Sequence, residues 1–304
     1  IFRVDNPHTK PIPFWEWVIG EVNGQYPDAI FLAEAFTRPK MMMKLAKAGY
    51  QQSYTYFTWR DTKQDLIAYS TELAGEMGEY YRPNFFANTP DINPIYLQTS
   101  GRAGFVVRAT LAATLSSVWG IYNGFEMCEA EPYPGKEEYL NSEKYELKAW
   151  DYDRPGNIRE HIVKLNRIRR DNPALWDFRN VTFTNAWNDN IIAYAKTTPE
   201  RDNCVFIMVN LDPKNRQECT YEVPLWLLGL PDDTAWHPVD ALPATAFDHG
   251  SIVRSARWKN SCVDSSAWRR ICGGNSRTRR RIGPSRCRTG PEKAFRPRLS
   301  SIEP

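Results

Sequence analysis

The feature that most constrains the fold of this chain is a regular alternation, over residues 1–170, of short apolar runs and helical periods. Each run has four or five residues, which suits a buried strand, and a stretch with apolar residues three and four positions apart follows it. Such alternation predicts parallel strands joined by helical crossovers. We expect strands at 1–4, 29–33, 52–56, 84–87 and 118–121, and helices at 39–48, 61–77, 102–116 and 157–170, with another helix opening at Pro11.

Local signals refine the first two helices. In the first, apolar residues spaced three and four apart predict the side that faces the core, namely Phe14, Trp17, Val18 and Val22. The second helix should end at Gly49, because glycine adopts the left-handed conformation that often follows a helix.

The pattern divides the chain into three regions. Five strands with their helices make just over half of an eight-stranded (β/α)8 barrel of the TIM type, so 1–172 is predicted to be its C-terminal half. Over 173–246, short strands at 181–183, 191–194, 204–209 and 219–223 are separated by turn residues, which predicts an antiparallel β-sandwich. The expected fold class is therefore α/β, followed by an all-β domain.

The third region, 247–304, differs from the rest in charge. Residues 251–304 carry 12 Arg and 2 Lys against three acidic residues, whereas the remaining residues carry 25 basic and 33 acidic side chains. A basic tail without helix or strand periodicity is compatible with a nucleic-acid-binding arm. We favour a second interpretation, that it is out-of-frame coding sequence after a frameshift, and we expect no nucleic-acid partner.

Cysteine spacing and hydropathy exclude several classes of protein. No CxxC pair occurs, so the sequence predicts neither a zinc site nor a redox dithiol, and we expect no metal and no cofactor. No apolar run reaches 18 residues, so no membrane span is expected. Together with the scattered cysteines, this favours the cytoplasm. The first residue is Ile1, which predicts that the true start lies upstream or that the chain is a fragment.

Three carboxylates follow the ends of predicted strands. Asp5 and Glu34 come directly after the first and second strands, and Asp91 lies four residues beyond the fourth. In α/β barrels, catalytic side chains come from the carboxyl ends of several strands. We therefore expect the three carboxylates to meet at one edge of the sheet.

Two such carboxyl groups can perform retaining glycosyl transfer. That chemistry needs an ionised nucleophile and a protonated general acid, so similar groups must have different pKa values. Arg3 precedes Asp5 by two residues, and side chains two apart share a face of a strand. We therefore expect Arg3 to lie beside Asp5 and keep it ionised.

The segments around these residues resemble a known enzyme family. Residues 2–8, 31–36 and 88–91 resemble the second, third and fourth signature regions of the α-amylase superfamily of glycoside hydrolases. Longer stretches, at 5–11, 34–39, 52–60, 88–92 and 142–146, resemble one branch, the bacterial α-1,4-glucan:maltose-1-phosphate maltosyltransferases. The resemblance covers about residues 1–245.

The resemblance implies a role for each carboxylate. In the family, the matching positions are the nucleophile (Asp5), the general acid/base (Glu34) and a transition-state-stabilising carboxylate (Asp91). It also implies the partners, maltose 1-phosphate as donor and an α-1,4-glucan as acceptor, together with a homodimer in the bacterial cytoplasm.

Four further residues gain a meaning from the resemblance. Asn6 matches a position near the donor phosphate, although an Asn-Pro turn would also account for it. Lys144 and Tyr145 match a pair that holds the donor sugar. Pro90 occupies the position where ordinary amylases place a histidine, which agrees with the transferase branch and argues against a plain starch hydrolase.

Two alternatives stay open. The chain could be an α-amylase-type hydrolase or another transglycosylase of α-glucans, or an inactive truncated product that only binds glucan or RNA. The superfamily's first signature region and the first three barrel strands have no counterpart here. We therefore expect the isolated chain to be inactive and poorly soluble, because an open barrel leaves a strand edge unpaired.

Overall fold

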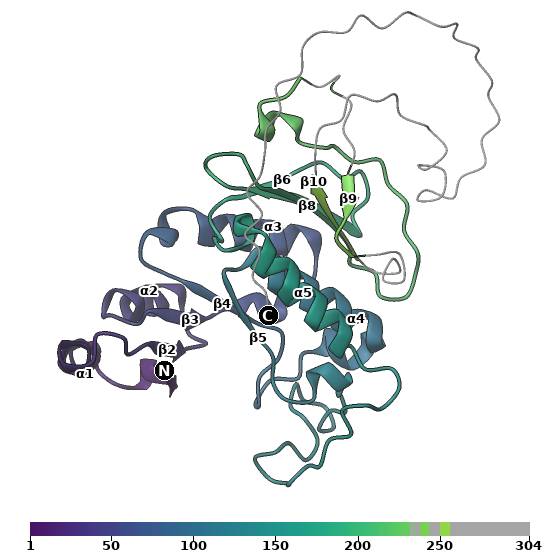
Figure 1. Ribbon diagram of the computed structural model, residues 1–304. Coiled ribbons are helices and arrows are strands. Elements are labelled where there is room, and N and C mark those ends of the chain that lie inside the picture. Colours follow the sequence, from purple (N-terminus) through teal and green to yellow (C-terminus); the bar gives the residue numbers. More distant parts are fainter. Residues whose placement is uncertain (232–233, 235–237, 243–249, 256–304) are drawn as a thin grey trace, which may run out of the picture. The chain divides into compact units, whose positions relative to one another are not determined.

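The computed structural model describes residues 1–231, 234, 238–242 and 250–255, all within one structural unit, Ile1–Cys262. Its first part is a five-stranded parallel sheet in the order β1-β2-β3-β4-β5 (Figure 1). The strands are β1 (Phe2–Asp5), β2 (Phe31–Glu34), β3 (Gln52–Tyr54), β4 (Pro83–Phe86) and β5 (Val118–Gly120). The five parallel strands predicted from the apolar runs are confirmed, in sequence order.

A helix follows each strand, as expected for helical crossovers. The helices are α1 (Ile12–Gln25), α2 (Pro39–Lys47), α3 (Lys63–Ala74), α4 (Ile95–Leu115) and α5 (Arg159–Asp171). Helix α2 ends before Gly49, whose φ of 115° lies in the region that glycine favours. Helix α3 begins at the N-cap Thr62, whose side chain accepts the backbone N–H of Asp65 at 3.2 Å.

The buried face of α1 differs in part from the prediction, although Val22 packs against the core as expected. Trp15 and Ile19 face the core, whereas Phe14 and Trp17 are 42% and 62% exposed. Trp15 packs edge-on against Tyr50, with ring centroids 5.5 Å apart. Because α1 carries aromatic residues at successive positions, the spacing of three and four fits more than one face, and packing against the sheet selects Trp15.

Helix α4 begins seven residues before the predicted start at 102, because a non-helical residue interrupts it. Gly101 has φ 59° and ψ −164°, which kinks the helix. The part beyond the kink is almost entirely buried and includes Arg108, which is 1% exposed. Its guanidinium donates to the carbonyls of Phe57 and Arg60 and lies 3.3 Å from an Asp61 oxygen, so the buried charge is compensated.

The second part is a five-stranded antiparallel sheet in the order β6-β7-β8-β10-β9. Its strands are β6 (Val181–Phe183), β7 (Ile191–Thr197), β8 (Cys204–Asn210), β9 (Pro238–Asp240) and β10 (Gly250–Ser255). This confirms an antiparallel β domain after the barrel strands. The strand expected at 219–223 is wrong in extent, because only Tyr221 forms an isolated bridge, to Ala186.

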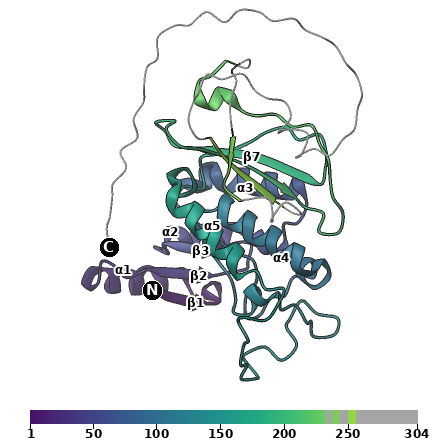
Figure 2. The same cartoon turned by 45° about the vertical axis from the view of Figure 1, so that its right-hand side comes forward.

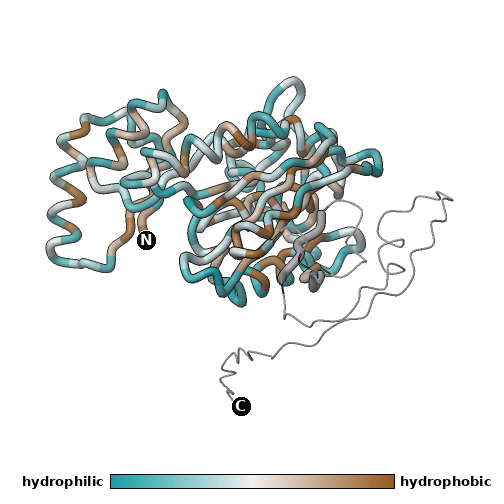
Figure 3. Tube along the Cα trace, turned by 90° about the horizontal axis from the view of Figure 1, so that it is seen from above, coloured by the Kyte–Doolittle hydropathy of each residue, from teal (hydrophilic) through white to brown (hydrophobic). Residues whose placement is uncertain are grey.

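Different residues pack against the two faces of the antiparallel sheet. One face lies toward α4 (Figure 2) and joins the core around that helix. There, Tyr194 and Thr114 share a hydrogen bond of 2.5 Å between their hydroxyl groups. On the other face, Phe206 packs with Tyr221 and Leu227 of the following loop. Apolar residues recur along the strands and along the covering helices (Figure 3).

Candidate active site

The carboxyl ends of the first three parallel strands bring predicted site residues together. β1 ends at Asp5, β2 at Glu34 and β3 at Tyr54. Asp5 is aligned with Glu34 in the register of the parallel pair. Adjacent strands lie about 4.8 Å apart, so the two carboxylates are neighbours on one edge of the sheet.

Arg3 contacts Glu34 rather than Asp5. Its guanidinium forms a hydrogen-bonded ion pair with the Glu34 carboxylate, whose side chain is only 6% exposed. Sequence spacing correctly put Arg3 beside the carboxylate pair, but the expected contact with Asp5 is replaced by one across the strands. The positive charge of Arg3 therefore acts mainly on Glu34, where it favours the ionised carboxylate.

Burial gives Glu34 an environment different from that of Asp5. Desolvation raises the pKa of Glu34, and the ion pair with Arg3 opposes this rise. Hydrogen bonding and charge from Asp5 raise the pKa of Glu34 further. Asp5 itself is exposed. A buried carboxyl group whose pKa is raised thus lies beside an exposed aspartate side chain.

Tyr54 is a site residue to which the sequence analysis gave no role. It is 6% exposed, its hydroxyl hydrogen-bonds with Arg3, and desolvation raises its pKa. Its ring stacks on Phe86 at the end of β4, with centroids 4.3 Å apart. Its position at the end of a parallel strand, like those of Asp5 and Glu34, is the signal that could have identified it.

Asn6 connects the end of β1 to the neighbouring strand β2. Its φ of 44° is left-handed, a conformation that asparagine tolerates better than most residues. Its backbone N–H donates to the Glu34 carbonyl at 3.2 Å, and its own carbonyl accepts from the N–H of Thr9 at 3.0 Å. The turn thereby fixes the backbone beside Asp5, while the Asn6 side chain is exposed.

Asp91, Lys144 and Tyr145 form a second contact group. The Lys144 ammonium forms a hydrogen-bonded ion pair with Asp91, and this bond raises the pKa of Lys144. The same ammonium lies 5.5 Å from the ring centroid of Tyr145. Asp91 and Lys144 are each about half exposed. The structure thus brings Asp91 to Lys144 and Tyr145, which lie more than fifty positions later in the sequence.

Buried polar contacts fix the loops that carry this second group. Asn88 is 1% exposed and donates to the Tyr139 hydroxyl at 2.7 Å, while its carbonyl oxygen accepts the N–H of Tyr122 at 2.8 Å. Glu143, next to Lys144, accepts hydrogen bonds from Asn123 and Trp150 at 2.9 and 3.0 Å. These bonds position the loop that presents Lys144 to Asp91.

Among the described residues, no ion pair or hydrogen bond links the first group to the second. Both groups follow the carboxyl ends of parallel strands. Within the described ranges, no three His, Cys, Asp or Glu side chains are arranged to hold a metal. Of the helices in that part of the chain, none has the length and hydropathy of a membrane span.

Sequence comparison identifies the relatives of this chain. A family model described as "GLGE, C-terminal" matches residues 183–254. An α-1,4-glucan:maltose-1-phosphate maltosyltransferase of Cereibacter sphaeroides is 60% identical over 252 residues, which cover 82% of this chain and 38% of the relative. The enzyme of the same name from Pseudomonas aeruginosa is 57% identical, over 80% of this chain and 37% of the relative.

The chain belongs to this maltosyltransferase family. It spans just over a third of the length of the curated relatives that it matches. The family-model match ends at residue 254, beyond residue 247, where the basic tail was predicted to begin. Of that tail, only residues 250–255 are described, so the frameshift interpretation concerns residues that lie almost wholly outside the described part.

Solved structures show the same fold in more distant proteins. An α-amylase from H. orenii has a TM-score of 0.57 at 15% identity, with 84% of this chain and 60% of that chain covered. A γ-cyclodextrin glucanotransferase from alkalophilic Bacillus clarkii has the same TM-score and identity, with 84% and 40% covered. The maltosyltransferase-family chain thus has the fold of the corresponding part of an α-amylase.

Proposed function

We propose that this chain carries the catalytic carboxylates of a retaining maltosyltransferase, which moves a maltosyl unit from maltose 1-phosphate to the non-reducing end of an α-1,4-glucan. The observation that carries the proposal is the pair Asp5 and Glu34. They are aligned on adjacent strands, and burial raises the pKa of Glu34 while Asp5 is exposed. Unequal environments for two neighbouring carboxyl groups are what this chemistry requires.

The spacing supports retention of the anomeric configuration. Carboxyl groups in retaining enzymes lie about 5–5.5 Å apart, whereas inverting enzymes separate them by about 6.5–9.5 Å to admit a water molecule. Neighbouring parallel strands with Asp5 opposite Glu34 match the shorter separation.

In the first step, an Asp5 oxygen attacks the anomeric carbon of the donor. The bond from that carbon to the phosphate oxygen breaks, and phosphate leaves with both bonding electrons. The protonated Glu34 transfers its proton to the departing oxygen and becomes ionised. Since phosphate is a good leaving group, this step demands less of Glu34 than the cleavage of a glycosidic bond does.

In the second step, the 4-hydroxyl of the acceptor attacks the same carbon. Glu34 accepts the hydroxyl proton, the bond to Asp5 breaks, and Asp5 returns to its ionised form. The proton on Glu34 is thereby restored for the next turnover. Asp91 would stabilise positive charge that develops on the sugar. Its carboxylate forms an ion pair with the ammonium group of Lys144.

Binding roles follow from the positions of three other residues. The exposed Asn6 amide, beside Asp5, would donate a hydrogen bond to the donor phosphate. Lys144 and Tyr145, joined by a cation–π contact, would hold the donor sugar. A homodimer in the bacterial cytoplasm completes the proposal, on the family resemblance.

A domain exchange tests this function in a full-length enzyme. Residues 1–245 of this chain would replace the matching segment of the Cereibacter sphaeroides relative, and phosphate release from maltose 1-phosphate would be measured with glycogen present. We expect glycogen-dependent phosphate release that Asp5→Asn abolishes. A folded chimera without turnover, beside an active parent, would contradict the proposal. Reducing sugar released from starch alone would indicate a hydrolase instead.

A further inference from the structure

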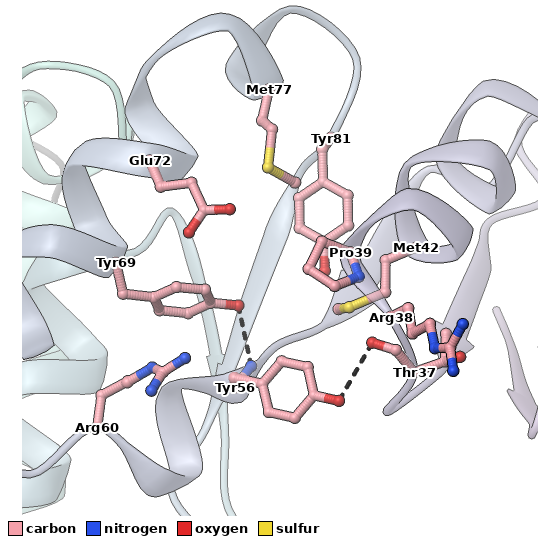
Figure 4. Close-up of a pocket in the computed structure, with 10 residues that line it drawn as sticks. All are labelled: Thr37, Arg38, Pro39, Met42, Tyr56, Arg60, Tyr69, Glu72, Met77 and Tyr81. Carbon is pink, nitrogen blue, oxygen red and sulfur yellow. Dashed lines mark hydrogen bonds between the residues drawn. The ribbon is translucent and has the colours of Figure 1, made fainter.

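A pocket of about 500 Å³ lies between α2 and α3, apart from the carboxylate pair (Figure 4). One wall comes from the connection after β2 and the start of α2, including Arg38 and Met42. The opposite wall comes from α3 and the short 3-10 helix before it, including Arg60, Tyr69 and Glu72. Pockets for small ligands span about 300–1,000 Å³, so this one can hold one or two sugar rings.

The aromatic side chains of the pocket are held by hydrogen bonds to the backbone. The Tyr56 hydroxyl donates to the Thr37 carbonyl at 3.1 Å, and the Tyr69 hydroxyl accepts the Tyr56 N–H at 2.9 Å. The Tyr81 hydroxyl donates to the Tyr54 carbonyl at 2.8 Å. Because their polar ends are bound, these tyrosines offer mainly their apolar rings to a ligand.

The charged side chains of the pocket have no ionic partner among the described residues. Arg38, Arg60 and Glu72 appear in no ion pair and no side-chain hydrogen bond within those ranges. The Nε of Arg60 is buried without a hydrogen-bond acceptor there, and its guanidinium lies 5.2 Å from the ring centroid of Tyr69. The pocket thus combines uncommitted donors, an uncommitted acceptor and apolar rings.

We infer that this pocket binds the end of an α-glucan chain as a second, non-catalytic site. Sugar hydroxyls both donate and accept, so they can satisfy Arg60 and Glu72 together, while the apolar faces of the rings pack on tyrosine and methionine. A simple anion fits less well, because it would meet the Glu72 carboxylate. Thr37 is three residues after Glu34, so the pocket begins on the strand connection that leaves the catalytic edge.

This inference rests on the proposed function only for the identity of the ligand, an α-glucan. The test is titration of the 304-residue chain with maltotriose, followed by saturation-transfer NMR at low protein concentration. We expect binding that Glu72→Gln and Arg60→Met each weaken at least about tenfold. Glu76→Gln and Arg82→Met are matched controls, since both side chains are exposed and lie outside the pocket. Thermal melts verify that each variant folds.

The direction in which Glu72→Gln changes the ligand affinity distinguishes a sugar ligand from an anion. Loss of a like charge would tighten the binding of inorganic phosphate, whereas loss of a carboxylate acceptor weakens the binding of a sugar. Unchanged maltotriose affinity in both variants, no binding at all, or competition by inorganic phosphate would overturn the inference. If Arg60→Met fails to fold, the exposed Arg38→Gln gives the same test, with the same weakening expected.

The two proposals fail separately. A chain that binds maltotriose in the pocket, within a chimera that does not turn over maltose 1-phosphate, keeps this inference and removes the catalytic one. An active chimera with unaltered glucan binding in the pocket variants does the reverse.

Discussion

Arg3 and Glu34 form an ion pair that crosses two adjacent parallel strands diagonally. Arg3 is aligned with Leu32, and it is Asp5 that stands opposite Glu34. The Arg3 guanidinium therefore contacts the buried Glu34 carboxylate and not the residue with which Arg3 is aligned. It moderates a pKa that desolvation would otherwise raise further. In the mechanism proposed above, this balance would let Glu34 act first as an acid and then as a base.

Removal of Arg3 should raise the pKa of Glu34. The guanidinium favours the ionised form of Glu34, so Arg3→Met leaves desolvation and the Asp5 charge unopposed. Carbon-13 NMR titration of the glutamate side-chain carboxyl groups measures the shift, with Glu34→Gln to assign the signal. Arg82→Met, at an exposed arginine that has no ion pair within the described part of the chain, should leave the titration unaltered. A fall in the pKa of Glu34 in Arg3→Met would contradict the assigned role.

The contact between Asp91 and Lys144 should matter for donor binding more than for stability. Both side chains are about half exposed, and pairs of this kind contribute roughly 0–1 kcal/mol. Lys144→Met should therefore shift the melting temperature little but weaken maltose 1-phosphate binding at least about tenfold. Calorimetry on the wild-type and variant chains measures both. Equal donor affinity in the two chains would remove Lys144 from the site.

Lys196 should destabilise the fold at neutral pH. It is 0% exposed, donates to the Asp177 carbonyl, and desolvation lowers its pKa from 10.5 to about 7. Between those values the unfolded chain binds the extra proton, so stability rises with pH across this window. Below pH 7 the destabilisation is complete.

Lys196→Met should therefore stabilise the chain by about 1–3 kcal/mol at pH 6, and by less as the pH approaches 10.5. The lost hydrogen bond to Asp177 offsets part of the gain. Urea melts at several pH values measure this, with the exposed Lys10→Met as control. A destabilisation that is independent of pH would show that the ammonium is accommodated without cost.

Gly120 should be sensitive to the smallest enlargement. A Cβ there would come within 2.4 Å of the Phe86 ring, which stacks on Tyr54. Gly120→Ala should therefore cost about 1–3 kcal/mol and disturb the hydrogen bond between Tyr54 and Arg3. Gly24→Ala, with nothing within 4 Å of its Cβ, should instead stabilise α1 slightly. Urea melts of both variants measure the difference.

The sequence was most informative where local pattern determines structure. Apolar runs identified all five parallel strands, and the rule that parallel strands share a carboxyl edge placed Asp5 beside Glu34. The partner of Arg3 was not predictable. The period-two alternation of a strand shows which face of the sheet a side chain lies on, but not which residue of the neighbouring strand it contacts. The contact between Lys144 and Asp91 depends on loops fixed by buried Asn88, which no local pattern encodes.

Packing decided what periodicity left ambiguous. On α1 the core side is Trp15 and not Trp17, because contact with Tyr50 selects one of two apolar faces. The start of α4 was predicted too late in the sequence, because the non-helical backbone of Gly101 interrupts the helix. The pocket between α2 and α3 has no sequence signature, because its walls come from segments that only tertiary structure brings together.

Trapping the covalent intermediate tests the central claim most directly. A maltosyl donor with a 2-fluoro substituent and a good leaving group forms the glycosyl-enzyme and slows its breakdown, because fluorine destabilises the cationic transition state. Mass spectrometry of the digested chimera should find the added maltosyl group on the peptide that contains Asp5, and Asp5→Asn should remove it. An adduct on another residue, or none in a folded chimera whose parent is labelled, would contradict the assignment of Asp5 as the nucleophile.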